Sequence, residues 1–214
     1  MSILVFGDSI SCITHGEGGY IKTLEKTFSP IKVHNFAISG SGLSTGTPNS
    51  CLKVVKALGC QSDVNYSLCL IWHATNDWYW GTPLGDPLCA DETTFFGSID
   101  LLVKKLRSFS PLGLMVWVAP IYRWEQPFET SREGNAFLID NKVGLTLADY
   151  AGALEYASKI YGFPVVPMHE LTQFHEGNAD HFFEDGVHPN RAGYDRIEKS
   201  LIPYLKQYKS ILEL

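Results

Sequence analysis

Two segments near opposite ends of the chain carry residues that could form a serine nucleophile and its base. Near the N-terminus, a short apolar run stops at Gly7-Asp8-Ser9. This pattern is typical of a buried strand that delivers a serine to the edge of a sheet. A serine hydroxyl is a weak nucleophile by itself, so Ser9 needs an imidazole base and donors for the negative charge that develops on the substrate. Read alone, Ser9 could also simply cap the helix that follows it.

The second segment is Asp185-Gly186-Val187-His188, near the other end of the chain. A carboxylate three residues before a histidine in a tight loop can contact the imidazole Nδ1 and leave Nε2 free to accept the Ser9 proton. The alternative is that Asp185-Gly186 only forms a turn before a helix that starts near Pro189. Together with Gly-Asp-Ser at the far end of the chain, the pair favours the catalytic interpretation.

The elements that must position these residues alternate along the chain. Apolar runs predict strands at 2–7, 32–37, 65–72, 113–119 and 163–167. Helical spacing predicts helices at 17–28, 51–58, 92–109, 135–161 and 191–208. Pro203 should kink or interrupt the last of these helices. The segment 78–91 is predicted to be a loop. This alternation predicts an α/β fold, a three-layer α/β/α sandwich around a five-stranded parallel sheet. With the order 2-1-3-4-5, the ends of the first three strands bring Ser9, Gly40 and Asn76 together.

Composition narrows the classes of partner. The chain has 214 residues, 45% of them hydrophobic, and we expect a single domain over residues 1–214. A net charge of −6 with scattered Lys and Arg argues against nucleic acid or an anionic membrane as a partner. No apolar run is long enough to span a membrane and no secretory signal is recognisable, so we expect a cytoplasmic protein.

Cofactor chemistry finds little support in the sequence. The five cysteines are odd in number and lack CxxC spacing, so neither a zinc site nor a closed disulfide framework is expected. Cys12, one helical turn after Ser9, reads as a packed thiol. Three histidines and an aspartate in a polar loop could suggest a metal site, but they offer no pair of ligands on one helical face, so we expect no metal there. These residues are His169, His175, Asp180 and His181.

Four short blocks, in order along the chain, resemble those of the SGNH, or GDSL-type, hydrolase family. They are Gly7-Asp8-Ser9, the segment from Asn35 to Gly40, Thr75-Asn76-Asp77, and Asp185 with His188. The resemblance implies a flavodoxin-like SGNH hydrolase fold and a serine esterase that uses neither metal nor organic cofactor. It also implies that Ser9 attacks, His188 is the base and Asp185 orients it, while Ser9, Gly40 and Asn76 form the oxyanion hole.

One position departs from the family pattern. The asparagine block of the family usually begins with glycine, and here that residue is Ala74. We expect a tighter turn without loss of catalysis. If Ala74 needs a positive φ, however, the block would be strained and Asn76 displaced. A separate motif, Gly42-Leu43-Ser44-Thr45-Gly46, matches a nucleophile elbow, but it lacks a strand before the serine and a helix after it.

Residues after the third and fourth strands are candidates for substrate binding. These residues are Trp78, Tyr79, Trp80, Tyr122, Arg123 and Trp124. Their side chains could stack on sugar faces or line an acyl pocket. The alternative is that they pack within their own loops. Their loops resemble those of family members, some phage-encoded, that remove esters from carbohydrates. We therefore expect a small-molecule or carbohydrate ester as substrate, with a small acyl group such as acetyl. The alternatives are a lysophospholipase or thioesterase with a longer acyl pocket, and a catalytically silent carbohydrate-binding or assembly protein. The sequence does not indicate an oligomeric state.

Overall fold

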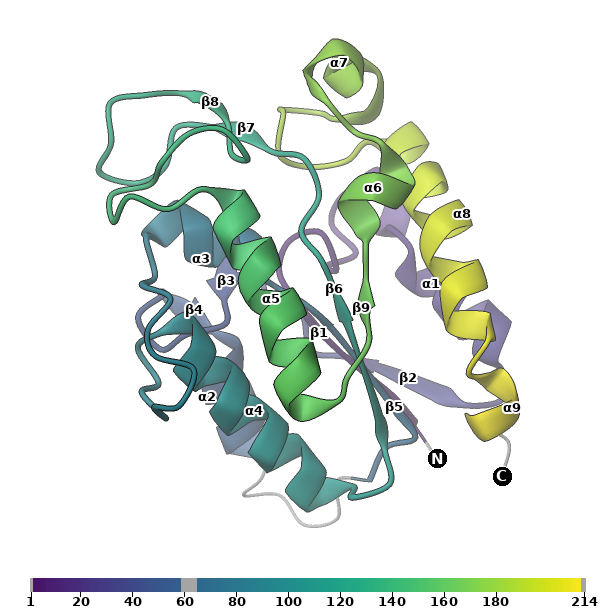
Figure 1. Ribbon diagram of the computed structural model, residues 1–214. Coiled ribbons are helices and arrows are strands. Elements are labelled where there is room, and N and C mark those ends of the chain that lie inside the picture. Colours follow the sequence, from purple (N-terminus) through teal and green to yellow (C-terminus); the bar gives the residue numbers. More distant parts are fainter. Residues whose placement is uncertain (1, 59–64, 213–214) are drawn as a thin grey trace.

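A five-stranded parallel sheet forms the centre of the protein. The computed structural model describes residues 2–58 and 65–212 (Figure 1). The strands of the central sheet are β1 (Ser2–Gly7), β2 (Lys32–Asn35), β5 (Leu68–Trp72), β6 (Leu114–Val118) and β9 (Val165–Val166). Their spatial order is β2-β1-β5-β6-β9 and every pair is parallel, which confirms the predicted fold class and strand order.

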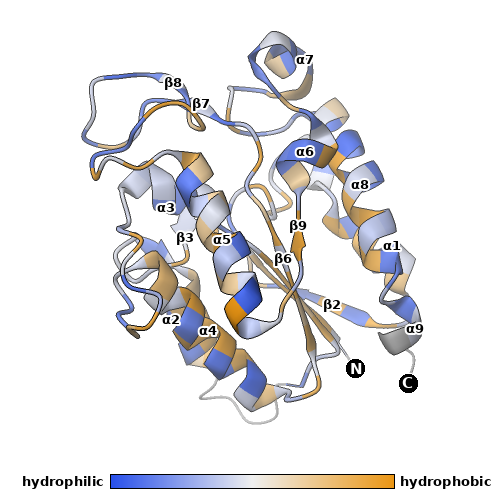
Figure 2. Ribbon diagram, viewed as in Figure 1, coloured by the Kyte–Doolittle hydropathy of each residue, from blue (hydrophilic) through white to orange (hydrophobic). Residues whose placement is uncertain are grey.

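Helices cover both faces of the sheet, because alternate residues of its central strands point to opposite sides. Ile3 and Val5 of β1 pack in one apolar cluster, against helices α1 (Ile21–Phe28) and α8 (Arg191–Lys206). Leu4 and Phe6 pack in the other, against α2 (Cys51–Leu58), α4 (Phe95–Phe109) and α5 (Leu147–Tyr161). Strands buried on both faces read as continuous apolar runs, which is why these strands could be predicted. Figure 2 shows this hydrophobic centre, with the more hydrophilic β2 at the edge.

Several predicted boundaries differ from the structure by a few residues, for example at the start of α1, and two predictions were wrong. The residues Trp78–Trp80, expected in a loop, lie in a short helix α3 (Thr75–Trp80), which stops at Gly81 with φ +69°. The predicted helix 135–161 begins only at Leu147. Thr146 and Asp149 form a reciprocal capping box that fixes this start, and the preceding residues form an irregular loop.

Pro203 does not interrupt the last long helix. Helix α8 continues through it to Lys206, and the Pro203 side is exposed to solvent. Pro203 has no N–H to donate to the Lys199 carbonyl, and because Lys199 is also exposed, water can donate to that carbonyl instead. The prediction of an interruption was therefore wrong.

Smaller elements surround the carboxyl ends of the strands. They are η1 (Gly16–Gly18), β3 (Ser41–Gly42), β4 (Asn49–Ser50), β7 (Trp124–Glu125), β8 (Gly134–Asn135), α6 (Met168–Thr172), η2 (Glu176–Asn178) and α7 (Ala179–Phe182), with α9 (Lys209–Leu212) after α8. β3 pairs with β4 and β7 with β8. Within residues 2–58 and 65–212, no helix combines the length and apolarity that crossing a membrane would need.

Candidate active site

The ends of three neighbouring strands bring Ser9, Gly40 and Asn76 to one cavity. Ser9 follows β1, Gly40 follows β2 and Asn76 follows β5. The cavity has a volume of about 470 Å³, and Asp185 and His188 also line it. Residues from both ends of the chain therefore meet at the carboxyl edge of the sheet, as the strand order predicts.

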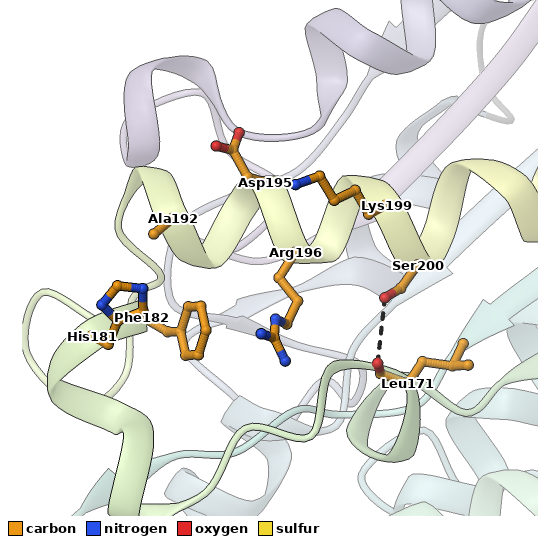
Figure 3. Close-up of a pocket in the computed structure, with 8 residues that line it drawn as sticks. All are labelled: Leu171, His181, Phe182, Ala192, Asp195, Arg196, Lys199 and Ser200. Carbon is orange, nitrogen blue, oxygen red and sulfur yellow. Dashed lines mark hydrogen bonds between the residues drawn. The ribbon is translucent and has the colours of Figure 1, made fainter.

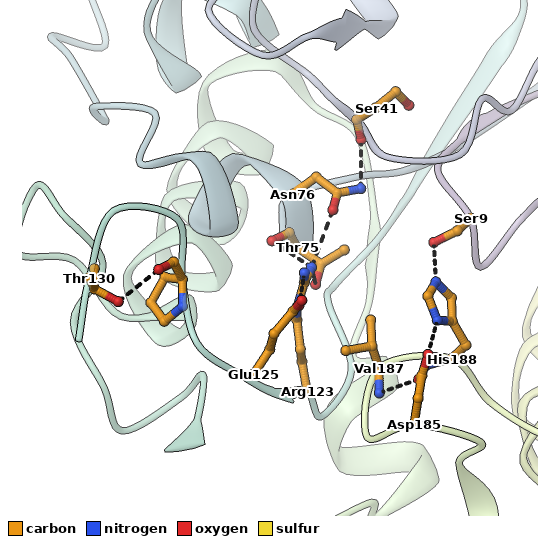
Figure 4. Close-up of polar contacts among 11 residues, drawn as sticks. Ser9, Ser41, Thr75, Asn76, Arg123, Glu125, Thr130, Asp185, Val187 and His188 are labelled. Carbon is orange, nitrogen blue, oxygen red and sulfur yellow. Dashed lines mark hydrogen bonds and ion pairs between the residues drawn. The ribbon is translucent and has the colours of Figure 1, made fainter. Parts of the chain in front are cut away.

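Ser9, His188 and Asp185 form a hydrogen-bonded row (Figure 4). The Ser9 Oγ lies 3.0 Å from His188 Nε2, and His188 Nδ1 lies 2.7 Å from Asp185 Oδ2. If Nδ1 carries the ring proton and donates a hydrogen bond to the carboxylate, Nε2 is left to accept the hydrogen bond from the serine hydroxyl. The row has the geometry of a nucleophile, a base and a group that orients the base.

The loop that carries Asp185 and His188 is fixed by its own backbone. The Asp185 Oδ1 accepts the N–H groups of Val187 at 3.0 Å and His188 at 2.7 Å. Partial burial would favour the neutral acid, but the hydrogen bonds from the His188 ring and these two N–H groups outweigh it and lower the pKa of Asp185. Gly186 has φ +81°, and Trp124 donates its N–H to the Gly186 carbonyl at 2.9 Å. The carboxylate is thus ionised and fixed in direction.

Gly40 sits in a turn that is tied to β1. The Ile38 N–H donates to the Gly7 carbonyl at 3.0 Å, and the Ser41 hydroxyl donates to the same oxygen at 3.1 Å. Gly40 has φ +73°, a conformation that favours glycine. Among the described residues, neither the Ser9 N–H nor the Gly40 N–H has an acceptor. Both are free to donate to a group bound in the cavity.

The Asn76 amide is held at both ends. Its Nδ2 donates to the Ser41 carbonyl at 3.0 Å, and its Oδ1 accepts from Arg123 Nη1 at 3.2 Å. An amide nitrogen has two hydrogens, so one remains for a ligand. Ala74 does have a positive φ, +115°, yet the expected displacement of Asn76 does not follow, because Ser41 and Arg123 hold its side chain at the cavity.

Arg123, a candidate for substrate binding, lines the cavity and also makes several contacts within the protein. Its side chain is almost completely buried, and Nη1 also donates to the carbonyl and the hydroxyl of Thr75, both at 3.2 Å. Its Nε donates to Glu125 Oε2 at 2.8 Å, and its guanidinium lies 4.9 Å from the centre of the Tyr79 ring. Most of the N–H groups of Arg123 therefore bind within the protein, and one of them holds the Asn76 amide.

The aromatic candidates divide into two groups. Trp78 and Tyr122 are buried in the apolar clusters, so for these two the packing alternative holds. The partly buried Tyr79, Trp80 and Trp124 line the cavity. Two carboxylates that the sequence analysis did not identify, Glu125 and Glu133, also line it. Nothing in the local sequence marks these carboxylates, because β7 and β8 bring their loop to the cavity only in the folded chain.

Three ionisable groups are buried beneath the cavity. Burial raises the pKa of Asp8 to about 7, and Asp8 Oδ2 has no partner among the described residues. Burial also raises the pKa of Asp77 to about 6, although its carboxylate accepts the Leu43 N–H at 2.7 Å and holds the turn beside the site. Burial lowers the pKa of His73 to about 4, so this imidazole is neutral.

The other sequence candidates lie elsewhere. Ser44, the serine of the elbow-like motif, is fully buried with its Oγ 3.2 Å from Thr82 Oγ1. His175 accepts the Gly177 N–H, while His169 stacks on Phe137 with ring centres 4.0 Å apart. The described cysteines are free thiols; they are Cys12, Cys51, Cys69 and Cys89, and Cys60 lies outside the described residues.

A second cavity, of about 510 Å³, lies between α6, α7 and α8 (Figure 3). His181 and Arg196 line it, and Arg196 stacks on Phe182 and donates to the Thr172 carbonyl at 3.1 Å. None of the candidate catalytic residues lines this cavity.

Comparison with known proteins places the chain in a family. The family model described as the GDSL-like Lipase/Acylhydrolase family matches residues 5–196. A comparison with curated protein sequences gives no match. Among solved structures, a protein from Lactobacillus plantarum has a TM-score of 0.80 at 22% identity, covering 97% of each chain.

Two further structures carry descriptive names. A possible lipase from Chitinophaga pinensis has a TM-score of 0.72 at 19% identity, covering 96% of this chain and 98% of its own. The psychrotrophic esterase EstA from Pseudoalteromonas sp. has a TM-score of 0.66 at 18% identity, covering 97% of each chain. At these identities the structures share the fold. With the family match over most of its length, the chain belongs to the GDSL-like lipase/acylhydrolase family and is a hydrolase that acts on esters.

Proposed function

We propose that the protein is a Ser-His-Asp esterase that removes a small acyl group, such as acetyl, from a carbohydrate. The observation that carries the proposal is the row of Ser9, His188 and Asp185, with contacts of 3.0 and 2.7 Å, beside the free N–H groups of Ser9 and Gly40. This arrangement supplies a nucleophile, a proton acceptor and charge stabilisation in one cavity.

The reaction follows from these positions in two halves. Ser9 Oγ attacks the acyl carbon while its proton passes to His188 Nε2, and Asp185 stabilises the imidazolium that forms. The carbonyl oxygen becomes an oxyanion that accepts from the Ser9 N–H, the Gly40 N–H and the free hydrogen of Asn76. The C–O bond to the alcohol then breaks, and His188 returns the proton to the leaving oxygen. Water, deprotonated by His188, releases the acid from Ser9 in the same way.

The walls of the cavity support a sugar as the alcohol part of the ester. Trp80 and Trp124 offer aromatic faces, and Glu125 and Glu133 offer carboxylates that can accept hydrogen bonds from hydroxyl groups. The guanidinium of Arg123 is already paired with Glu125, so among the residues lining the cavity no free cation remains for a phosphate headgroup. These features favour a neutral, hydroxylated substrate over a lysophospholipid.

Substrate preference tests this proposal. We expect hydrolysis of p-nitrophenyl acetate, slower hydrolysis of the butyryl ester and little of the octanoyl ester, together with release of acetate from acetylated oligosaccharides. Trp80→Ala should lower kcat/KM roughly tenfold on the oligosaccharide and much less on p-nitrophenyl acetate, because only the sugar stacks on the ring. Trp80→Phe, which keeps an aromatic face, is the matched control.

Two results would contradict the proposal. Preference for the octanoyl ester or for a thioester would favour a lysophospholipase or thioesterase. Unchanged turnover of p-nitrophenyl acetate by Ser9→Ala would remove the proposed nucleophile.

A further inference from the structure

His15 lies flat against the imidazole of His188. The two ring centres are 4.2 Å apart and the ring planes are inclined by only 10°. His188 is held at its edges by Asp185 and Ser9, through Nδ1 and Nε2. The His15 ring therefore covers a face of the imidazole that these edge contacts leave open.

The position of His15 is fixed from two sides. Its Nδ1 lies 3.2 Å from Glu184 Oε2, and the Glu184 N–H in turn donates to the His188 carbonyl at 2.8 Å. The Glu184 backbone hydrogen bond, the His15–Glu184 side-chain hydrogen bond and the ring stack thus form a closed circuit of contacts that starts and ends at His188. The circuit joins the segment after β1 to the loop that precedes α8.

The chain on the other side of His15 packs on α8. Gly16 has φ +52°, and a Cβ there would lie 2.0 Å from the Tyr194 ring. Tyr194 also donates its hydroxyl to the Ile10 carbonyl at 2.8 Å, close to Ser9. The segment from Ile10 to Gly16 is therefore held at both ends by a single buried side chain.

From this geometry we propose that His15 is a positioning residue for the base. The stacked ring and its Glu184 partner restrict rotation of the His188 side chain and keep Nε2 at the Ser9 hydroxyl. This inference rests on the proposed function, since it concerns the residue that accepts the serine proton. A catalytic group that leaves its productive orientation loses much of the advantage of proximity.

The test measures kcat and KM on p-nitrophenyl acetate for a small set of variants. His15→Ala should lower kcat by roughly tenfold or more while KM changes little, because the base is misplaced and the substrate cavity is intact. His15→Phe, which keeps a flat ring but not the hydrogen bond to Glu184, should be much less impaired than His15→Ala. Glu184→Ala should give an intermediate loss, and adding it to His15→Ala should cost nothing further.

Controls separate this inference from the proposed function. Ser9→Ala and His188→Ala should abolish activity; if they do not, the proposed function fails. If both do, but His15→Ala keeps the wild-type kcat, the positioning role is overturned. It is overturned equally if His15→Phe is as slow as His15→Ala. If His15→Ala does not fold, His15→Phe and Glu184→Ala decide the question, and wild-type kcat in Glu184→Ala overturns the circuit.

Discussion

Replacing Arg123 by methionine should reduce kcat through its effect on Asn76. Methionine keeps an unbranched stem of similar volume beside Tyr79 but removes the donors. The Arg123 contact of 3.2 Å to Asn76 Oδ1 disappears, and the amide is then held only by its hydrogen bond to the Ser41 carbonyl. An amide held by this one hydrogen bond presents its donor to the oxyanion only part of the time.

The size of the loss can be bounded. Complete removal of one oxyanion donor costs about 10²- to 10³-fold in kcat, or about 3–4 kcal/mol, and this is the loss expected for Asn76→Ala. Because Ser41 still anchors the amide, Arg123→Met should lose less, roughly ten- to a hundredfold. KM should change little, since the guanidinium of Arg123 already binds Thr75, Asn76 and Glu125.

A double-mutant cycle with p-nitrophenyl acetate as substrate measures the coupling. If Arg123 acts through Asn76, the double variant Arg123→Met/Asn76→Ala should be no slower than Asn76→Ala alone. The variant Arg123→Met/Glu125→Gln is the matched control, because it removes the carboxylate that Arg123→Met leaves without a partner. Losses that multiply across the cycle, or a rise in KM without a fall in kcat, would refute the reasoning and make Arg123 a direct substrate contact.

Two further predictions test the surroundings of the site. Since the pKa of Asp8 is raised from 3.8 to about 7, the folded protein binds the proton more tightly than the unfolded chain, and stability is lost as pH rises between these values. The unfolding free energy of Asp8→Asn relative to wild type should therefore increase by up to about 4 kcal/mol from about pH 4 to 8 in urea titrations; a flat difference would contradict a buried neutral acid. Gly40→Ala and Gly162→Ala both place alanine at a positive φ, +73° and +69°, with no atom within 4 Å of the new Cβ. Both should lose about 1–2 kcal/mol of stability in the same titrations. Alanine keeps the N–H, so kcat should fall only in Gly40→Ala, where relief of the unfavourable φ turns that N–H away from the cavity. Equal kcat in the two variants would contradict the claim that the positive φ of Gly40 is needed to aim its N–H.

The parts of the fold that could be predicted are those where local pattern and tertiary burial agree. Leu68–Trp72 is apolar throughout because both faces of the central strand are covered, so its position and its place in the sheet followed from the sequence. Helix α3 was not predicted, because a segment rich in aromatic residues does not show by itself that tertiary packing buries Trp78. The start of α5 depends on the cap at Thr146, which a periodicity argument overlooks.

The candidate site shows the same division. Ser9, His188 and Asp185 could be named because a strand end and a tight loop mark them locally, and they lie in a row. No local sequence pattern identifies His15 and Glu184 as part of the site. Their contacts, the stacking of His15 on His188 and the hydrogen bond between His15 and Glu184, join segments at opposite ends of the chain. Arg123 could be placed near the cavity but not assigned its contacts, because its partners lie on α3 and β7.

The most direct test of the central claim is covalent labelling with a p-nitrophenyl phosphonate ester, followed by peptide mass spectrometry. Ser9 Oγ should attack phosphorus and displace p-nitrophenolate while its proton passes to His188. We predict a single phosphonyl group on Ser9, loss of activity in step with labelling, and no labelling of His188→Ala. A label on another residue, or full labelling without His188, would contradict the account.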